Sequence, residues 1–453
     1  MKKTILPLLL LALLPAGLAR AQYYRPAFEK ITLENGLSVM FHRDTTLPVV
    51  SINIAYHGGS AWDPKGRSGL ATIAANMLLS ALPAHAASEL RRLDTTGGVS
   101  YAGLTNVDWT NLACTYPAKD LDAALWIEAE RMSSAADAVT PQLVAGAVQY
   151  QLQKMVKDAR QALWDVQPRL YAELYPENHQ YRHVSSGDTT DLKSITPADV
   201  EKFMKIFFVP ANASVTIGGN FRIDQARALV KKYFSKIPAG KRMQWKAQDK
   251  VLPPLGASSL IKQAPVEYEM LYIIFATRPI GDPDEPALKM LGHYLAGASD
   301  SPFKKALLDA YPTVLDISVT QSSQELDGTL WIVVTCTPDA RLQEVHDHIM
   351  TLLRKAAEKE IPELDLRMAR NLSEMQFLPP LEKFYGFGGR CDVLNLANLY
   401  TGNPLTPFLT IENQANVTSF ALREMLRKYC SPDHHVVMSI VAPTRTENAV
   451  TIK

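Results

Sequence analysis

The chain has 453 residues, of which 47% are hydrophobic and 21% charged, with 47 Lys and Arg against 46 Asp and Glu. This length corresponds to roughly two to three domains with large apolar cores. The balanced charge excludes proteins that bind nucleic acid or anionic membranes through a basic surface. The cysteines, 4 in all, include no Cys-x-x-Cys pair, which excludes a disulfide scaffold and a thiolate zinc knuckle. Buried free thiols are favoured, although disulfide pairing stays open in an oxidising compartment; the residues are Cys114, Cys336, Cys391 and Cys430.

The first residues are typical of a secretory signal peptide. Lys2 and Lys3 precede an apolar run at 5–18, and Ala19-Arg20-Ala21 is a small-x-small cleavage site. The apolar run is short for a bilayer span. We therefore expect cleavage of residues 1–21 near Ala21-Gln22 and a periplasmic or secreted mature chain. The loss of Lys2, Lys3 and Arg20 would take the 47 basic residues to 44, still balanced against the 46 acidic ones.

Local patterns in the first half alternate short strands with helices. The turn signal Asn35-Gly36 predicts a hairpin over 31–41, and 48–56 alternates as a strand with one apolar face. Apolar residues at helical spacing predict an amphipathic helix over 69–79. Thr196 and Pro197 are typical of a helix start. Further elements are predicted as helices at about 86–94, 121–132 and 141–166, and as strands near 100–105, 109–116 and 213–217.

The second half repeats this order after a segment rich in Pro and Gly at 245–259, which we expect to be a linker. Strands are predicted near 268–276, 313–320, 329–336 and 436–441, and helices near 285–296, 302–310, 342–359 and 363–377. We therefore expect two α+β units, residues 22–244 and 260–453, related by internal duplication.

Six segments in a fixed order carry a family resemblance. They are Leu33-Glu34-Asn35-Gly36-Leu37, Gly59-Ser60, Gly69-Leu70-Ala71 with Met77-Leu78, Gly97-Gly98 with Ala102 and Asp108-Trp109-Thr110-Asn111, Gly187-Asp188-Thr189-Thr190-Asp191-Leu192 with Ile195-Thr196, and Pro210-Ala211-Asn212 through Gly218-Gly219. In this order the chain resembles the insulinase/pitrilysin family of zinc metallopeptidases, in its short form with two homologous domains. The resemblance implies α/β sandwich domains, each a mostly antiparallel sheet packed with helices.

The zinc site of that family is substituted throughout. Its inverted motif, His-x-x-Glu-His, aligns with Thr72, Ala75 and Asn76, which supply neither imidazole ligands nor a general base. The family's third ligand, a Glu, should fall within 149–153, where Gln151 lies and where no acidic residue occurs. The resemblance therefore implies a non-catalytic member that holds no zinc itself.

The family also holds its substrate with an Arg and a Tyr seven residues apart. The Arg position falls at Leu308 or its neighbour and the Tyr position near Leu315, and Tyr311 lies out of register unless the helix end is shifted. We therefore expect the substrate-holding pair to be missing too.

Other motifs are interpreted as structural. His179 and His183, with Glu177 nearby, have a ligand spacing, but their segment is predicted as a loop without metal. His346 and His348 are assigned to a solvated helix face, and His434-His435 to a surface turn. His57 and His293 are also expected to be structural. No Gly-x-Ser-x-Gly elbow, phosphate loop or dinucleotide fingerprint occurs.

The resemblance implies a function through a partner. In this family two halves close like a clam around an extended peptide, and short chains achieve this by pairing a zinc-bearing subunit with one that lacks zinc. We therefore expect this chain to bind peptide beside a zinc-bearing homologue. The alternative is a structural or peptide-binding protein with no role in proteolysis, as in the core subunits of the respiratory cytochrome bc complex. An active peptidase with unfamiliar ligands is a third, weaker hypothesis.

Overall fold

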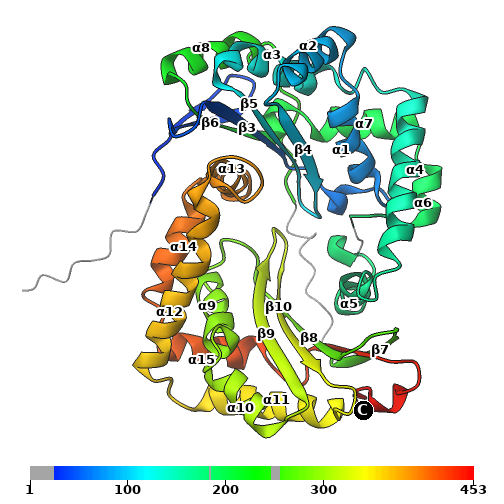
Figure 1. The fold of residues 1–453 in the computed structure, drawn as a ribbon, viewed down its shortest axis with the longest axis vertical. Helices are drawn as coiled ribbons and strands as arrows, with labels where there is room; N and C mark the ends of the chain where they lie inside the picture. Colours follow the sequence, from blue (N-terminus) through cyan, green and yellow to red (C-terminus); the bar gives the residue numbers. More distant parts are fainter. Residues whose placement is uncertain (1–24, 183–184, 246–255, 453) are drawn as a thin grey trace, which may run out of the picture.

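The computed structural model describes residues 25–182, 185–245 and 256–452. Its strands form two separate sheets, one of six strands and one of five, each packed with helices. In Figure 1 the first sheet lies above the second, and the outer helices of each cover the side that faces away from the other. This is the predicted fold class, two mixed α/β layers built on mostly antiparallel sheets.

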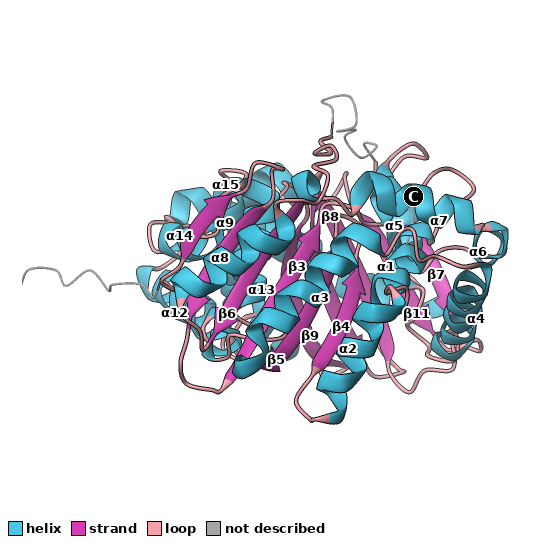
Figure 2. Cartoon of the chain, turned by 90° about the horizontal axis from the view of Figure 1, so that it is seen from above, coloured by secondary structure: helices cyan, strands magenta, loops and turns pink. Residues whose placement is uncertain are grey.

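The first sheet has the order β1-β2-β6-β3-β5-β4, and only β2 and β6 run parallel. Seen from above, α3 and α8 lie over its strands (Figure 2). Its strands are β1 (Glu29–Thr32), β2 (Ser38–Arg43), β3 (Val49–Tyr56), β4 (Ser100–Thr105), β5 (Thr110–Pro117) and β6 (Ala213–Gly219). The helices of this half are α1 (Leu70–Ser80), α2 (Ala84–Thr95), α3 (Leu121–Ser134), α4 (Pro141–Asp158), α5 (Val166–Leu174), α6 (Thr189–Ser194), α7 (Pro197–Phe207) and α8 (Ile223–Phe234).

The second sheet has the order β7-β11-β8-β10-β9 and again holds one parallel pair, β7 with β11. This arrangement repeats β2-β6-β3-β5-β4 of the first sheet, strand for strand. The strands are β7 (Ser258–Gln263), β8 (Glu269–Thr277), β9 (Val314–Ser323), β10 (Gly328–Cys336) and β11 (Val436–Val441). The helices are α9 (Glu285–Ala296), α10 (Pro302–Ala310), α11 (Leu342–Glu358), α12 (Glu363–Phe377), α13 (Arg390–Thr401), α14 (Thr406–Gln414) and α15 (Ser419–Tyr429).

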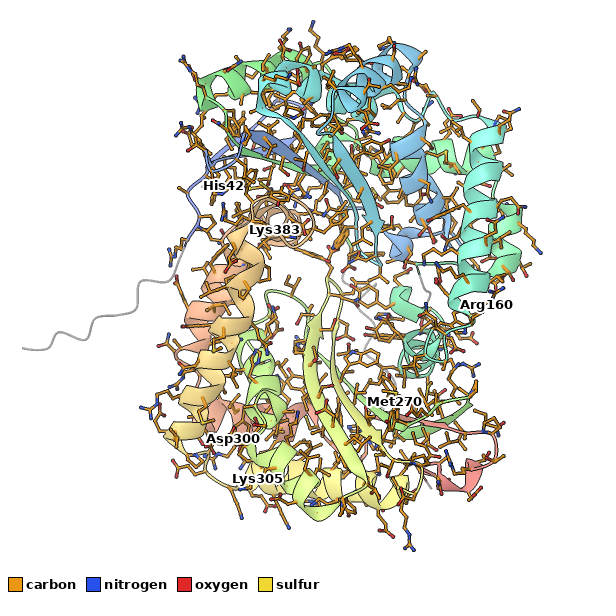
Figure 3. All side chains as sticks on the ribbon, viewed as in Figure 1. His42, Arg160, Met270, Asp300, Lys305 and Lys383 are labelled. Carbon is orange, nitrogen blue, oxygen red and sulfur yellow. The ribbon has the colours of Figure 1, made fainter. Side chains whose placement is uncertain are left out.

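One helix from each half packs on the sheet of the other half. Helix α13 packs on β3 and β6, and α5 packs on β11, so both inner sheet faces are covered by a helix from the opposite half (Figure 1). His42 of β2, labelled in Figure 3, accepts a hydrogen bond from Arg390 Nε of α13 at 3.0 Å. The two halves are therefore interlocked.

In strand β3 both faces are buried as a result of this helix exchange. The sequence predicts one apolar face, yet every residue from Val50 to Tyr56 is buried, because α13 covers the polar face. Asn53 on that face accepts from Asn395 Nδ2 at 2.6 Å through Oδ1 and donates through Nδ2 to Asp392 Oδ1 at 3.2 Å. A polar residue in an alternating strand is thus buried here because a distant helix satisfies it.

Several predicted boundaries need correction. The helix predicted over 141–166 ends at Asp158, and 159–165 join it to α5. The predicted linker at 245–259 falls largely on 246–255, outside the described residues, and its end, Ser258 and Ser259, pairs with β11 as part of β7. Helix α8 was not predicted. The capped start of α7 is confirmed, since Thr196 and Asp199 form a capping box.

The described cysteines are all buried and free, as expected for structural thiols. In the part of the chain that the structure describes, no single helix has the length and hydropathy to cross a bilayer. The pair α1 and α2 reaches both only when counted together across a bend of 71°.

Candidate functional site

Helix α1 carries three of the substituted positions, and it is held at its start by the partly buried Asp63 and at its end by the buried Arg131. At its start Gly69 has φ of 91° and cannot cap the helix itself, so Asp63 accepts from Gly69 N at 2.7 Å and Ala71 N at 2.8 Å. Burial raises the pKa of Asp63 to about 7, against the effect of these N–H donors. At its other end Arg131 Nη1 donates to the Leu78 carbonyl. The position of α1 is therefore fixed.

The predicted amphipathic pattern of α1 is confirmed. Its apolar stripe is buried in the first core; the residues are Leu70, Ile73, Ala74, Met77 and Leu78. Thr72 and Asn76 are only partly buried and lie on the opposite side, toward β4 and α4.

Strand β4 forms the second wall. It is the last strand of the first sheet and pairs only with β5 among the described strands, so its outer edge carries unpaired backbone groups. Ser100 to Leu104 are all exposed. At Gly103 a Cβ would lie 3.1 Å from the Leu79 side chain, so glycine permits the close approach of α1 to β4.

Helix α4 supplies the third wall. Thr140 accepts from Leu143 N and Pro141 opens the helix, which sets the register of the turns that follow. Gln151 is then buried in the site, and Tyr150 and Lys154 stay exposed at its rim.

All four substituted positions line one pocket. Its water-accessible volume is about 420 Å³, and its lining comprises Thr72, Ala75, Asn76, Leu79, Gly103, Leu104, Thr105, Tyr150, Gln151, Lys154, Ser185 and Ser186. The family resemblance assigned the third ligand position to residues 149–153, and the structure places Gln151 of that range beside α1.

The substituted side chains now bind protein backbone. Thr72 Oγ1 donates to the Ser185 carbonyl, and Gln151 Nε2 donates to the Ser186 carbonyl at 3.0 Å. Asn76 Nδ2 donates to the Thr72 carbonyl at 3.0 Å, one turn earlier in α1. Thr72 and Gln151 therefore tie α1 and α4 to the same short segment.

The side chains that line this pocket are not a set of ligands that fits zinc. Zinc sites in proteins use imidazole, thiolate or carboxylate ligands, and none of these groups lines the pocket. The hydroxyl hydrogen of Thr72 and one amide hydrogen of Gln151 are donated to backbone carbonyls. Across the described ranges, no group of three or more His, Cys, Asp or Glu side chains is placed to hold a metal ion.

The positions aligned with the substrate-holding Arg and Tyr lie in the second half. Leu308 of α10 packs against the second core, and Leu315 of β9 is exposed. Tyr311 donates to the Glu344 carbonyl at 3.3 Å. The side chains at these three positions therefore include no guanidinium that could hold a peptide backbone.

Two of the histidine assignments were wrong. His346 and His435, placed by the sequence on a solvated helix face and a surface turn, are both buried, and their Nε2 atoms lie 3.0 Å apart. The pairing follows from the packing of α11 against the segment that leads into β11. His434 is exposed as predicted.

The remaining histidines sit in structural environments. His179 is buried, stacks on Tyr175 at 4.2 Å and accepts from Tyr181 N through Nδ1, whereas His183 lies outside the described residues. His57 is buried and contacts Glu325 Oε2 at 2.5 Å. His293 is half-buried in α9.

Acid is expected to destabilise the fold through His179 and His435. Burial is the main reason that the pKa of each is lowered to about 4, and the neighbouring His346 contributes to the lowering of the pKa of His435. An unfolded histidine titrates near pH 6.5. The free energy of unfolding is therefore fully retained above about pH 6.5 and falls as the pH drops toward about 4, because the unfolded state binds protons first.

Urea unfolding at about pH 7.5 and about pH 5 measures this loss. His435→Asn should reduce the difference between the two pH values, and His434→Asn, at the exposed neighbour, should leave it unchanged. Equal pH dependence in the wild type and His435→Asn would contradict the assignment.

A buried carboxyl that sequence analysis missed joins the two halves. Asp108 accepts from Tyr181 OH at 2.6 Å, Tyr400 OH at 2.8 Å and Glu325 N at 3.1 Å. Burial raises its pKa to about 6. In the sequence Asp108 was noted only as part of a family segment. Its role could not be predicted because its hydrogen-bond partners lie 73, 292 and 217 residues away.

Known proteins resemble this chain in sequence. Residues 194–373 match the family model of the peptidase M16 inactive domain. The zinc protease PqqE of Helicobacter pylori is 24% identical over 378 residues, which are 80% of this chain and 82% of that protein.

Two solved structures share the fold. The peptidase M16 inactive domain from Pseudomonas fluorescens aligns with a TM-score of 0.78 at 15% identity, over 94% of this chain and 99% of that chain. The periplasmic protease PqqL from Escherichia coli aligns with a TM-score of 0.73 at 15% identity, over 95% of this chain and 49% of that chain. The present chain thus spans about half the length of PqqL.

Proposed function

We propose, from the premise that this chain belongs to the M16 (insulinase) peptidase family as a non-catalytic member, that it is an exported subunit that binds extended peptides. One observation carries the proposal. The four substituted positions line a pocket beside the exposed edge of β4, and its lining contains none of the side chains that zinc sites in proteins use.

The edge of β4 provides the binding mode. An extended peptide can add to an open sheet edge through main-chain hydrogen bonds, and pockets beside the edge then receive alternate side chains. Leu104 and Tyr150 are 46% and 61% exposed, and both line the pocket, so they offer apolar contact at its rim. None of these contacts requires a metal ion.

The partner in this proposal is a zinc-bearing homologue in the periplasm. A chain that holds peptide and lacks the hydrolytic centre contributes to proteolysis only beside a subunit that has one. The signal-like first residues and the periplasmic relative PqqL support the location.

Co-expression with an exported homologue that carries an intact His-x-x-Glu-His motif tests the proposal. We expect a stoichiometric complex whose peptide cleavage exceeds that of the zinc-bearing subunit alone by about tenfold or more. Peptide binding without any effect on cleavage would favour the alternative of a binding protein outside proteolysis. A purified chain that bound one zinc and cleaved peptides alone would contradict the proposal.

A further inference from the structure

The pocket beside β4 that is lined by the four substituted positions contains two side-chain amides, and their orientation determines which hydrogen-bonding atoms remain free. Gln151 and Asn76 each face a backbone carbonyl, which can only accept, so their NH₂ groups must point to Ser186 O and Thr72 O. Their carbonyl oxygens, Gln151 Oε1 and Asn76 Oδ1, are left without a donor among the described residues. The pocket therefore presents hydrogen-bond acceptors.

The charge of the lining is equally specific. No Asp or Glu lines the pocket, and Lys154 is its single charged residue. Lys154 Nζ lies 2.7 Å from Asp158, which is outside the lining, and its side chain is 50% exposed. An entering group therefore meets the two amide oxygens and one ammonium, together with hydroxyl groups such as those of Ser185 and Ser186, which can donate or accept.

We propose that this pocket takes a carboxamide, the side chain of Asn or Gln, from a peptide bound along β4. The inference rests on the proposed function and names the side chain that the groove selects. A carboxamide matches both features, because its NH₂ can donate to the oxygens of Asn76 and Gln151 and its carbonyl oxygen can accept from Lys154. The volume of about 420 Å³ accommodates a side chain of this size.

Other side chains of similar length each lack one of the features that a carboxamide offers. A glutamate has no donor for the two carbonyl oxygens, and a methionine leaves them without a partner when it displaces water. A lysine can donate, but it meets Lys154 and finds no carboxylate within the lining. The groove is thus expected to discriminate among side chains of almost equal length.

Four pools of peptides test the inference. Each pool holds 12-residue peptides, acetylated and amidated at their ends, randomised except for a central Gln, Glu, Met or Lys. We expect the full mature chain to bind the Gln pool about tenfold more tightly than each of the other three, as measured by fluorescence anisotropy, a difference that corresponds to about 1.4 kcal/mol.

Two variants assign the preference to atoms. Asn76→Leu removes one acceptor at a partly exposed position and should remove most of the preference for Gln over Met. Lys154→Gln should remove the penalty against the Lys pool, while Lys157→Gln, on the same helix but outside the lining, should leave all four affinities unchanged. Circular dichroism verifies that each variant is folded.

The outcomes separate this inference from the proposed function. Equal binding of the four pools by the wild type, or a Gln preference that survives in both Asn76→Leu and Lys154→Gln, would overturn the carboxamide pocket and leave peptide binding in place. No binding of any pool would overturn both.

Discussion

Replacing Arg131 with Met is expected to lower the free energy of unfolding by about 3–5 kcal/mol, because it leaves a buried carboxylate without its cation. Arg131 Nε donates to Glu128 Oε2 at 3.0 Å, and both side chains are 0% exposed. Tyr116 OH also donates to Glu128 Oε1, and Arg131 caps the end of α1 at Leu78 O. Urea unfolding of the variant at neutral pH gives the measurement.

Two controls isolate the buried charge as the cause. The double variant Glu128→Met/Arg131→Met removes both charges together and should recover part of the loss, since a buried pair replaced by apolar groups is often tolerated. Arg92→Met breaks an exposed pair with Glu89 at the same i, i+3 spacing and should leave the unfolding midpoint in place. A loss in Arg92→Met equal to that in Arg131→Met would contradict the explanation.

Replacing Asp392 with Ala is expected to cost about 3–4 kcal/mol and to loosen α13 from the first sheet. Asp392 Oδ1 accepts from Asn111 Nδ2 at 2.5 Å and from Asn53 Nδ2 at 3.2 Å, and Oδ2 accepts from Gly388 N at 2.7 Å. Without the carboxylate these donors lose their acceptor in a buried site. Burial also raises the pKa of Asp392, which reflects how far the group lies from water.

Hydrogen exchange locates the effect of this variant. Amides of β3 and α13 should exchange faster, while β8 and β10 of the second sheet keep their protection. Asp392→Asn retains one acceptor oxygen and should lose less stability than Asp392→Ala. Uniform loss of protection across both sheets would show that Asp392 acts on global stability and does not specifically hold the two halves together.

Local sequence patterns predicted most secondary structure in this chain. Helices α9, α10 and α12 and strand β11 have the bounds predicted for them, since apolar spacing and turn residues act within a few residues. The family resemblance drawn from six short segments is supported by two comparisons together: residues 194–373 match the peptidase M16 inactive domain, and the zinc protease PqqE of Helicobacter pylori is 24% identical over 80% of this chain. Strand β7 was missed because its residues, Ser258 to Gln263, carry no alternating apolar face.

Interactions between the halves could not be predicted in this way. The exchange of α5 and α13 joins residues separated by more than 170 positions, and it explains why Asn53 and Asn111 are buried in β3 and β5. The same limit applies to His346 and His435, whose contact joins α11 to the segment that leads into β11. Each is a polar residue for which composition favours the surface, and burial depends on a partner that sequence spacing does not reveal.

For the four substituted positions, the sequence and the tertiary structure determine different properties. The sequence by itself determined that Thr72, Ala75, Asn76 and Gln151 cannot supply zinc ligands, because ligand chemistry is a property of residue type. Only the tertiary structure decided that all four line one pocket beside an open strand edge. It also decided that Gln151 and Asn76 turn their amide nitrogens toward backbone carbonyls. Which atoms of a side chain remain free depends on hydrogen-bond partners that packing brings together, and that is the physical reason the pocket's specificity was not predictable from the sequence.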